Sequence, residues 1–264
     1  ERANSDEIDE AKLVALLRQH YAKSEMLQAI TIANRLILNN PAQPVAWSVL
    51  GAAKLALGYH DEAEAAFAKL KTLRPNDANV CNNFAAALMG NHKYGEAIDN
   101  FYAAIKIKKD FLDAHVGLAF CLHAEDRLEE ALSTSEASLK LNPVDGRVLH
   151  LLGIIKLKQG KNEEAISALD QAVKSRVLSS DAHRQLSLLT KYQVGHAHIA
   201  QVEKLLSISE LTPYDRCQLN YTYAKMKEDL DEFDQAFKHY CAAGTLRKQM
   251  LNYDVAKDIS FFRK

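Results

Sequence analysis

Residues 44–75, PVAWSVLGAAKLALGYHDEAEAAFAKLKTLRP, contain two amphipathic segments separated by a short turn. The apolar residues of the first segment recur at the spacing of one helix face, at Val45, Trp47, Leu50, Ala53 and Leu55. After the turn GYHDE the same spacing returns at Ala63, Ala66, Phe67 and Leu70. Pro75 closes the stretch, because proline cannot continue a helix. The stretch therefore predicts two antiparallel helices joined by a tight turn.

This pattern recurs every 34 residues through five cycles without an insertion. One column contains only alanine, at Ala29, Ala63, Ala97, Ala131 and Ala165. The column twelve residues upstream contains Leu17, Gly51, Ala85, Ala119 and Gly153. A third column contains Pro41, Pro75, Lys109, Pro143 and Val177. A fixed period of this length indicates a helical repeat protein, in which each repeat buries its apolar face against its neighbours.

The small columns are interpreted as packing positions. Gly51 and Ala63 would lie where the two helices of a pair cross, and would let the backbones approach. Trp47, Leu50 and Phe67 would fill the space beside the crossing.

Helix pairs of this length with these columns resemble the tetratricopeptide repeat, and the second cycle carries nearly the whole pattern of that family, at Trp47, Leu50, Gly51, Ala63, Phe67 and Pro75. The resemblance implies an all-α fold, a right-handed α-α superhelical solenoid of about six to seven helix pairs. The departures from the family pattern are Lys54 and Lys156 in place of an aromatic residue, Ser135 in place of a large apolar residue, and Lys109 and Val177 in place of proline. They predict looser packing around the fourth cycle.

The domain organisation follows from the same register. Within residues 5–179 we expect five in-phase units at about 10–43, 44–77, 78–111, 112–145 and 146–179. A variant helix pair is expected at 180–213, because Pro213 comes two residues late. Residues 214–264 would form a final unit with a C-terminal helical extension.

The last third of the chain resembles a second, more specific pattern. Its motifs are HRQLS at 183–187, DEFDQAFKHY at 231–240 and YDVAKDISFF at 253–262. They are similar to the junction segment of bacterial proteins in which tetratricopeptide repeats precede a sulfotransferase domain. The resemblance implies a docking region of a larger enzyme, and the phosphate-cradling loop that such an enzyme needs does not occur in this sequence.

Composition excludes several classes of function. The 33 Lys and Arg residues nearly balance the 34 Asp and Glu residues, which argues against nucleic-acid or anionic-membrane partners. The four cysteines lie far apart without a CxxC pair, which argues against a zinc site and a disulfide framework. No apolar run reaches the ~20 residues of a membrane-spanning helix. These features predict a cytoplasmic protein without cofactor or metal.

A catalytic site is not predicted, and the chain as it stands is expected not to be an enzyme. His196 and His198 in GHAH point about 200° apart on a helix, so we interpret them as a solvated turn or cap rather than metal ligands. Cys81 and Cys217 fall near packing columns and are expected to be buried as small apolar residues.

In the resembled family the first helix of each pair lines a concave surface, and this implies a peptide-binding wall. The predicted contact residues are Asn79, Asn82, Asn83, Met89, Phe120, His123, Arg147, His150, Ile154, Lys158, Arg184 and Lys191. Val45, Ser48, Ala52, Leu55, Val116 and Leu188 belong to the same wall. The asparagine amides could pair with the backbone of an extended peptide, and the later basic residues would give that half of the wall a positive charge.

Three functions are compatible with these features. The first is a scaffold that binds a protein or peptide on the concave face. The second is the substrate-recruiting region of a sulfotransferase whose catalytic domain is absent from this chain. The third is self-association into a homo-oligomer through an apolar end formed by Ile259, Phe261 and Phe262.

Overall fold

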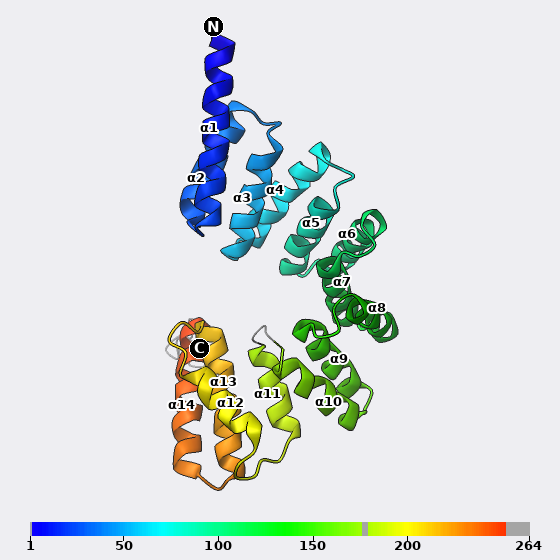
Figure 1. The fold of residues 1–264 in the computed structure, drawn as a ribbon, viewed down its shortest axis with the longest axis vertical. Coiled ribbons are helices and arrows are strands. Elements are labelled where there is room, and N and C mark those ends of the chain that lie inside the picture. The colour runs from blue at the N-terminus through cyan, green and yellow to red at the C-terminus, as the bar shows by residue number, and fades with distance from the viewer. Residues whose placement is uncertain (1, 176–178, 252–264) are drawn as a thin grey trace, which may run out of the picture. The chain divides into compact units, whose positions relative to one another are not determined.

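A computed structural model describes the backbone of residues 2–175 and 179–251, and the side chains of this part from Glu10 onward. These residues form fourteen α-helices and no strand (Figure 1). The helices are α1 (Arg2–Ala22), α2 (Met26–Asn39), α3 (Pro44–Ala56), α4 (His60–Leu73), α5 (Ala78–Gly90), α6 (Tyr94–Ile107), α7 (Leu112–Ala124), α8 (Leu128–Leu141), α9 (Gly146–Lys158), α10 (Asn162–Val173), α11 (Ser180–Leu189), α12 (Ala197–Leu206), α13 (Pro213–Asp229) and α14 (Phe233–Met250). The predicted all-α helical repeat fold is confirmed.

Two compact units divide the chain, Glu1–Asn142 with α1 to α8 and Pro143–Lys264 with α9 to α14. In the first unit each helix from α1 to α7 packs against the next one. There α1, α3, α5 and α7 also contact one another in order and form one layer. In the second unit α9 packs against α10, α13 against α14, and α11 against both α10 and α13. The repeats predicted from the 34-residue period are therefore distributed over both units.

Glycine residues of the first helices make room for large side chains of the second helices. A Cβ atom added to Gly51 would lie 2.8 Å from the buried ring of Phe67. A Cβ at Gly117 would lie 2.3 Å from the Phe101 ring. We expected Gly51 to let the two backbones approach with Phe67 beside the crossing, and the structure shows the Phe67 ring packed directly against Gly51. The alanine column is buried as predicted, with Ala29, Ala63, Ala97, Ala131 and Ala165 all at 0% exposure.

The turns inside the pairs share one unusual backbone conformation. A residue with positive φ recurs in each of the first five pairs, at Ser24, Gly58, His92, Asp126 and Gly160, and again at Asp231. Glycine adopts this left-handed conformation without the steric cost that other residues incur. Four of the six positions are not glycine, and three of these four are Asp or His, which adopt this conformation more readily than most other residues.

The departures from the family pattern have local compensation. Lys54 forms an ion pair of 2.6 Å with Glu62, and Lys156 forms the same pair, at 2.7 Å, with Glu164. Each pair joins the end of a first helix to the start of the second helix. Ser135 is fully buried, and its hydroxyl donates to the carbonyl of Ala131 at 2.7 Å. The Ser135 hydroxyl therefore has a hydrogen-bond partner. The serine side chain buries less apolar surface than the side chains of Phe67 and Phe101.

Substitution of Gly117 should test the steric constraint at the helix crossings. We expect Gly117→Ala to lower the free energy of unfolding by about 1–3 kcal/mol, because the new methyl group must displace the Phe101 ring. A Cβ at Gly95 in α6 meets nothing within 4 Å, so Gly95→Ala should leave stability unchanged or raise it by up to about 1 kcal/mol. Urea unfolding followed by circular dichroism measures both variants. Equal stability of the two variants would contradict the assigned contact.

Candidate functional site

Helix α5 of the first unit carries a group of three asparagine amides. Asn79 is exposed at the start of α5, while Asn82 and Asn83 are half-buried one turn later. The Asn82 Nδ2 group donates to the Asn83 Oδ1 atom at 3.2 Å, and the Asn82 Oδ1 atom is buried without a hydrogen-bond partner. No described residue accepts from the Asn83 Nδ2 group or bonds to the Asn79 side chain. Asn82 thus holds the oxygen of Asn83 and leaves the Asn83 amide hydrogens for another acceptor.

The other predicted contact residues of the first unit lie further along the same layer. Met89 at the end of α5 and Phe120 and His123 on α7 are all half-buried. Val116, which we placed on the same wall, is instead buried with 5% exposure. This correction arises because Val116 belongs to the face of α7 that packs inward.

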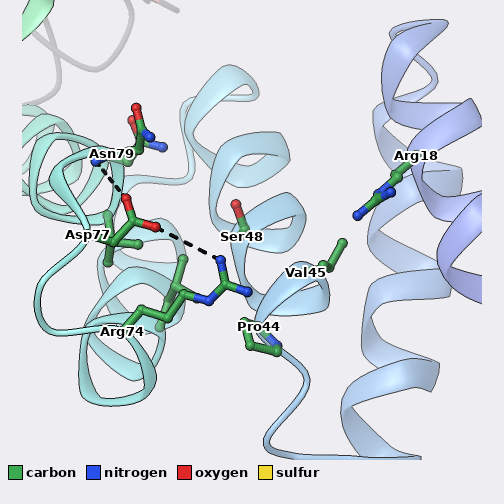
Figure 2. Close-up of a pocket in the computed structure, with 10 residues that line it drawn as sticks. Arg18, Pro44, Val45, Ser48, Arg74, Asp77 and Asn79 are labelled. Carbon is green, nitrogen blue, oxygen red and sulfur yellow. Dashed lines mark hydrogen bonds and ion pairs between the residues drawn. The ribbon is translucent and has the colours of Figure 1, made fainter.

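A pocket of about 290 Å³ lies between α1, α3, α4 and α5 (Figure 2). Its wall includes the predicted residues Val45, Ser48, Asn79 and Asn83, and it adds two arginines that sequence reasoning missed, Arg18 and Arg74. The pocket residues are Arg18, Pro44, Val45, Ser48, Leu70, Arg74, Asp77, Asn79, Val80 and Asn83. A pocket of this size is at the lower end of ligand sites, so it suits one or two side chains of a longer ligand.

The sequence did contain a signal for Arg18. It stands 34 residues before Ala52 and 102 residues before Phe120, in a column that we assigned to the wall. Extending the column by one period to the first repeat would have found it. Arg74 follows the last turn of α4 as its C-cap residue, and no column of first-helix residues points to it.

Asp77 is the one carboxylate among the described residues that line the pocket, and local contacts occupy it. Its Oδ1 atom accepts from the backbone N–H of Asn79 at 2.9 Å, which caps α5. Its Oδ2 atom lies 3.9 Å from Arg74 Nη1, at the limit of an ion pair. Figure 2 shows Arg18 extending from α1 toward Val45, while the Arg74 guanidinium points toward Ser48. Two guanidinium groups therefore share the pocket with one carboxylate.

The predicted basic residues of the second unit are mostly engaged already. Arg147 pairs with Asp145 at 2.8 Å, and Lys191 pairs with Asp229 at 2.9 Å. Arg184 lies over the Tyr221 ring at 4.9 Å. Burial raises the pKa of Asp145, but the hydrogen bonds and charge of Arg147 outweigh burial and hold that pKa below its ordinary value. Two of the four basic residues that we expected on this half of the wall, Arg147 and Lys191, are therefore paired with carboxylates of the chain itself.

The remaining predicted residues of the second unit lie on α9. His150 and Ile154 are half-buried, and Lys158 is exposed. These three residues belong to the second unit, whereas Asn79, Asn82 and Asn83 belong to the first.

Three buried polar side chains join α11 to α12. The Nδ1 atom of His183 lies 2.8 Å from Nε2 of His198, and the hydroxyl of Tyr192 lies 2.7 Å from Nδ1 of His198. The two imidazole rings are stacked, with centroids 5.0 Å apart. We expected His198 to be solvated, and this is wrong because it is only 5% exposed. His196 does cap α12, since its Nδ1 atom accepts from the His198 N–H at 3.2 Å.

This cluster replaces the usual helix contact in the variant pair. His183 stands four periods after Trp47, whose indole Nε1 donates to the carbonyl of Pro41 at 2.8 Å. In the variant pair His183 faces His198 instead, while the backbone N–H of Tyr192 donates to Asp229 on α13 at 3.2 Å. These contacts fix the longer connection between α11 and α12. They form a buried polar cluster between α11 and α12.

The described part of the chain also bears on the expectations for metal sites, cysteines and membrane-spanning helices. No group of three or more metal-ligating side chains lies together among the described residues. Cys81 and Cys217 are buried, as predicted, and Cys121 is buried with them. Among the helices that the structure describes, none is long and apolar enough to cross a membrane.

Three family models described as tetratricopeptide repeat match residues 45–77, 88–153 and 150–189. The human protein named Tetratricopeptide repeat protein 21B is 30% identical over 153 residues, which are 54% of this chain and 12% of the human protein. Its mouse counterpart is 27% identical over 165 residues, again covering 12% of the relative. The chain thus corresponds to a small part of the length of these relatives.

Solved structures share the fold at low identity. A tetratricopeptide repeat protein from Parabacteroides merdae matches with a TM-score of 0.65 and 15% identity, over 90% of this chain and 93% of that chain. YrrB, described as a TPR protein with an unusual peptide-binding site, matches with a TM-score of 0.55 and 18% identity, over 64% of this chain and 90% of that chain. At these identities the likeness shows the shared fold.

The histidine pair predicts acid sensitivity of the second unit. Burial lowers the pKa of His183 to about 4. Burial, with the neighbouring His183 and His196, lowers the pKa of His198 to about 3, and Asp170 opposes this shift weakly. An unfolded histidine has a pKa near 6.5, so the unfolded state binds protons below that pH that the folded state does not bind. Stability is therefore fully present above about pH 6.5 and decreases as the pH falls toward 4.

We expect the loss to reach on the order of 2 kcal/mol per histidine by pH 5. Urea unfolding between pH 7 and pH 5 measures it. The His92→Asn variant removes an exposed histidine of the first unit and should keep the wild-type pH dependence. A free energy of unfolding that stays constant from pH 7 to pH 5 would contradict the buried, neutral state of the pair.

Proposed function

The chain belongs to the tetratricopeptide repeat family, and on this premise we propose that it is a non-catalytic scaffold that binds an extended protein segment. The family and fold support a protein-interaction repeat scaffold in general terms. The specific site that we propose is the layer of odd-numbered helices in the first unit. The observation that carries the proposal is the group of uncommitted amides at Asn79 and Asn83 beside the pocket.

Amide side chains suit an extended ligand because they both donate and accept hydrogen bonds. An extended peptide presents backbone N–H and C=O groups that no secondary structure satisfies, whatever its sequence. The Asn79 amide and the Asn83 Nδ2 group lie free at the pocket wall to meet them. Met89 and Phe120 further along the layer would receive an apolar side chain of the ligand.

The unpaired oxygen of Asn82 supports a functional role for this cluster. A buried polar atom without a partner typically lowers stability by about 1–3 kcal/mol, and native proteins contain few of them. Here the hydrogen bond from Asn82 Nδ2 orients the Asn83 amide, while the Asn82 Oδ1 atom stays without a partner. Packing alone would favour an apolar residue at position 82. YrrB, which has the same fold, is described as having a peptide-binding site, and this is compatible with the proposal.

The resemblance to a sulfotransferase junction stays a prediction. The matching family models end at Leu189, and the motif at 253–262 lies outside the described residues. The predicted cytoplasmic location likewise stays a prediction.

Peptide arrays test the proposed site directly. We expect the full chain to bind a subset of random dodecapeptides anchored on an array. The double variant Asn79→Ala with Asn83→Ala should bind the peptides that the wild-type chain binds best about 10- to 30-fold more weakly in fluorescence anisotropy, because two hydrogen bonds are lost. The control pair Asn34→Ala with Asn39→Ala removes two exposed amides of α2 and should bind like wild type. Equal binding by both double variants, or no peptide binding at all, would overturn the proposal.

Self-association is a second candidate function, and an exposed apolar face of α14 favours it. Phe237 directly follows the column alanine Ala236, as Ile98 follows Ala97. Ile98 is 3% exposed where α7 packs against α6, whereas Phe237 is 71% and Phe233 is 62% exposed. The apolar end first predicted from Ile259, Phe261 and Phe262 lies outside the described residues.

A charge on this face should separate chains that associate through it. We expect the wild-type chain to show a concentration-dependent increase in mass in sedimentation velocity, and Phe237→Asp to abolish it. Burial of a carboxylate in an apolar contact carries a large desolvation free energy. Leu27→Asp places the same charge on an exposed apolar position of α2 and serves as the matched control. A wild-type chain that stays monomeric at all concentrations would rule out this candidate.

A further inference from the structure

We infer that α14 pairs with α14 of a second copy of the chain in antiparallel orientation, about a two-fold axis near Cys241. The inference rests on the self-association proposed above as a second candidate function. It specifies the orientation of the two helices, the register between them and the residues that meet. The surface concerned is called the α14 seam and consists of Asp234, Phe237, Cys241, Gly244, Lys248 and Leu251.

The α14 seam has the spacing of a helix-pairing surface. Its residues follow one another at alternating intervals of three and four positions, which keeps them on one side of the helix and is the pattern through which helices pair. All six are exposed, whereas Ala236 and Ala243 are buried on the side of α14 that packs against α13. Figure 1 shows α14 at the edge of the second unit, with α13 beside it. The described helices of the chain therefore leave the seam uncovered.

The corresponding face of an earlier second helix is covered by the next repeat. Ile98 and Ile105 of α6 stand at the positions of Phe237 and Gly244. Because α7 packs against α6, Ile98 is buried and Ile105 is half-buried. At α14 the same face carries an exposed phenylalanine instead. Exposed apolar surface of this kind marks a site of interaction with another chain.

No contact in the described part of the chain requires glycine at position 244. A Cβ atom added to Gly244 would meet nothing within 4 Å. Glycine inside a helix lowers the stability of that helix relative to alanine. The approach of a second helix gives a physical reason for this glycine, because the missing side chain leaves room for a large one. In the antiparallel pair, Phe237 of the second copy occupies that room.

The two ends of the seam carry opposite charges. Asp234 stands seven residues before Cys241 and Lys248 seven residues after it, which is about two helical turns on either side. No hydrogen bond or ion pair joins either side chain to another residue of the described part of the chain. A two-fold axis near Cys241 brings Asp234 of each copy to Lys248 of the other. A parallel pair would place like charges together at both ends, so the charges favour the antiparallel orientation.

A second copy of the chain fits the seam because the seam is complementary to itself. In a two-fold contact the same surface serves both partners, so each residue and the residue that receives it must lie on one chain. Phe237 is received at Gly244 and Asp234 at Lys248, in nearly symmetric positions about Cys241. The chain therefore supplies both halves of each contact.

Disulfide trapping tests the register on the full chain. Cys241 is exposed and the other three cysteines of the chain are buried, so mild oxidation with diamide should link two copies through Cys241. We expect a dimer on a non-reducing gel and a monomer for Cys241→Ser. Leu27→Cys in the Cys241→Ser background presents an exposed thiol on α2 and should cross-link at least about tenfold more slowly. Equal rates for the two thiols would indicate random collision and overturn the inference.

A mixed cross-link distinguishes the two orientations. In the Cys241→Ser background, Asp234→Cys and Lys248→Cys chains that carry tags of different length are mixed before oxidation. The antiparallel pair predicts mainly disulfides between unlike chains, because the two new thiols face each other. Disulfides mainly between like chains would indicate a parallel pair, and would overturn the inference while self-association itself stays intact.

Charge reversal measures the same contact without oxidation. We expect Asp234→Lys to raise the dimer dissociation constant about tenfold in sedimentation velocity, because the two-fold contact contains this exposed pair twice. The double variant Asp234→Lys with Lys248→Asp should return to within about threefold of wild type. Asp99→Lys makes the same change at an exposed position of α6 and should dimerise like wild type. A double variant that dimerises no better than Asp234→Lys would contradict the pairing.

The outcomes separate this inference from the proposed self-association. A wild-type chain that stays monomeric at all concentrations overturns both. If Phe237→Asp lowers the melting temperature of such a monomer, residues 252–264 of the same chain cover the seam instead. Dimers that Phe237→Asp abolishes, but that neither charge reversal nor Cys241 oxidation affects, overturn the antiparallel register alone. Circular dichroism melting shows whether each variant is folded, and the exposure of Asp234 and Lys248 predicts unchanged melting temperatures.

Discussion

The contact between a glycine of one helix and a large side chain of a neighbouring helix is the constraint on which the rest of the array depends. Phe67 fills the space above Gly51, Phe101 fills the space above Gly117, and Leu169 would lie 2.6 Å from a Cβ at Gly153. A methyl group at any of these glycines would push apart two close-packed helices. The distance between neighbouring helices, and with it the register of every exposed residue, follows from these contacts.

This register explains how a functional surface can arise without any dedicated loop. Because the packing contacts occupy fixed positions in each first helix, the remaining positions of α1, α3 and α5 recur on one layer. Arginine, serine and asparagine can vary there without disturbing the core. Arg18 and Asn83 come from repeats two periods apart, and the stacking of the helices brings them to one pocket. The candidate site is thus a consequence of repetition combined with local variation.

The second unit shows what happens when the constraint changes. In the variant pair, α11 and α12 are each ten residues long, and a longer connection containing Tyr192 replaces the tight turn. The stacked pair of His183 and His198 joins the two helices through a hydrogen bond between the rings. Polar packing of this kind is directional and depends on the protonation of both rings. Stability and pH are consequently coupled in this unit through residues that face the core.

The sequence by itself determined the helical repeat, its 34-residue period and the buried alanine column, because each of these depends on contacts between residues at constant spacing. The tertiary structure alone decided which polar groups are free. Lys191 is neutralised by Asp229, which lies 38 residues away, and His198 is buried by a histidine of another helix. Arg18 and Arg74 share a pocket that no local pattern connects. Side-chain pairing between positions of different columns is not periodic, so only the packed chain specifies it.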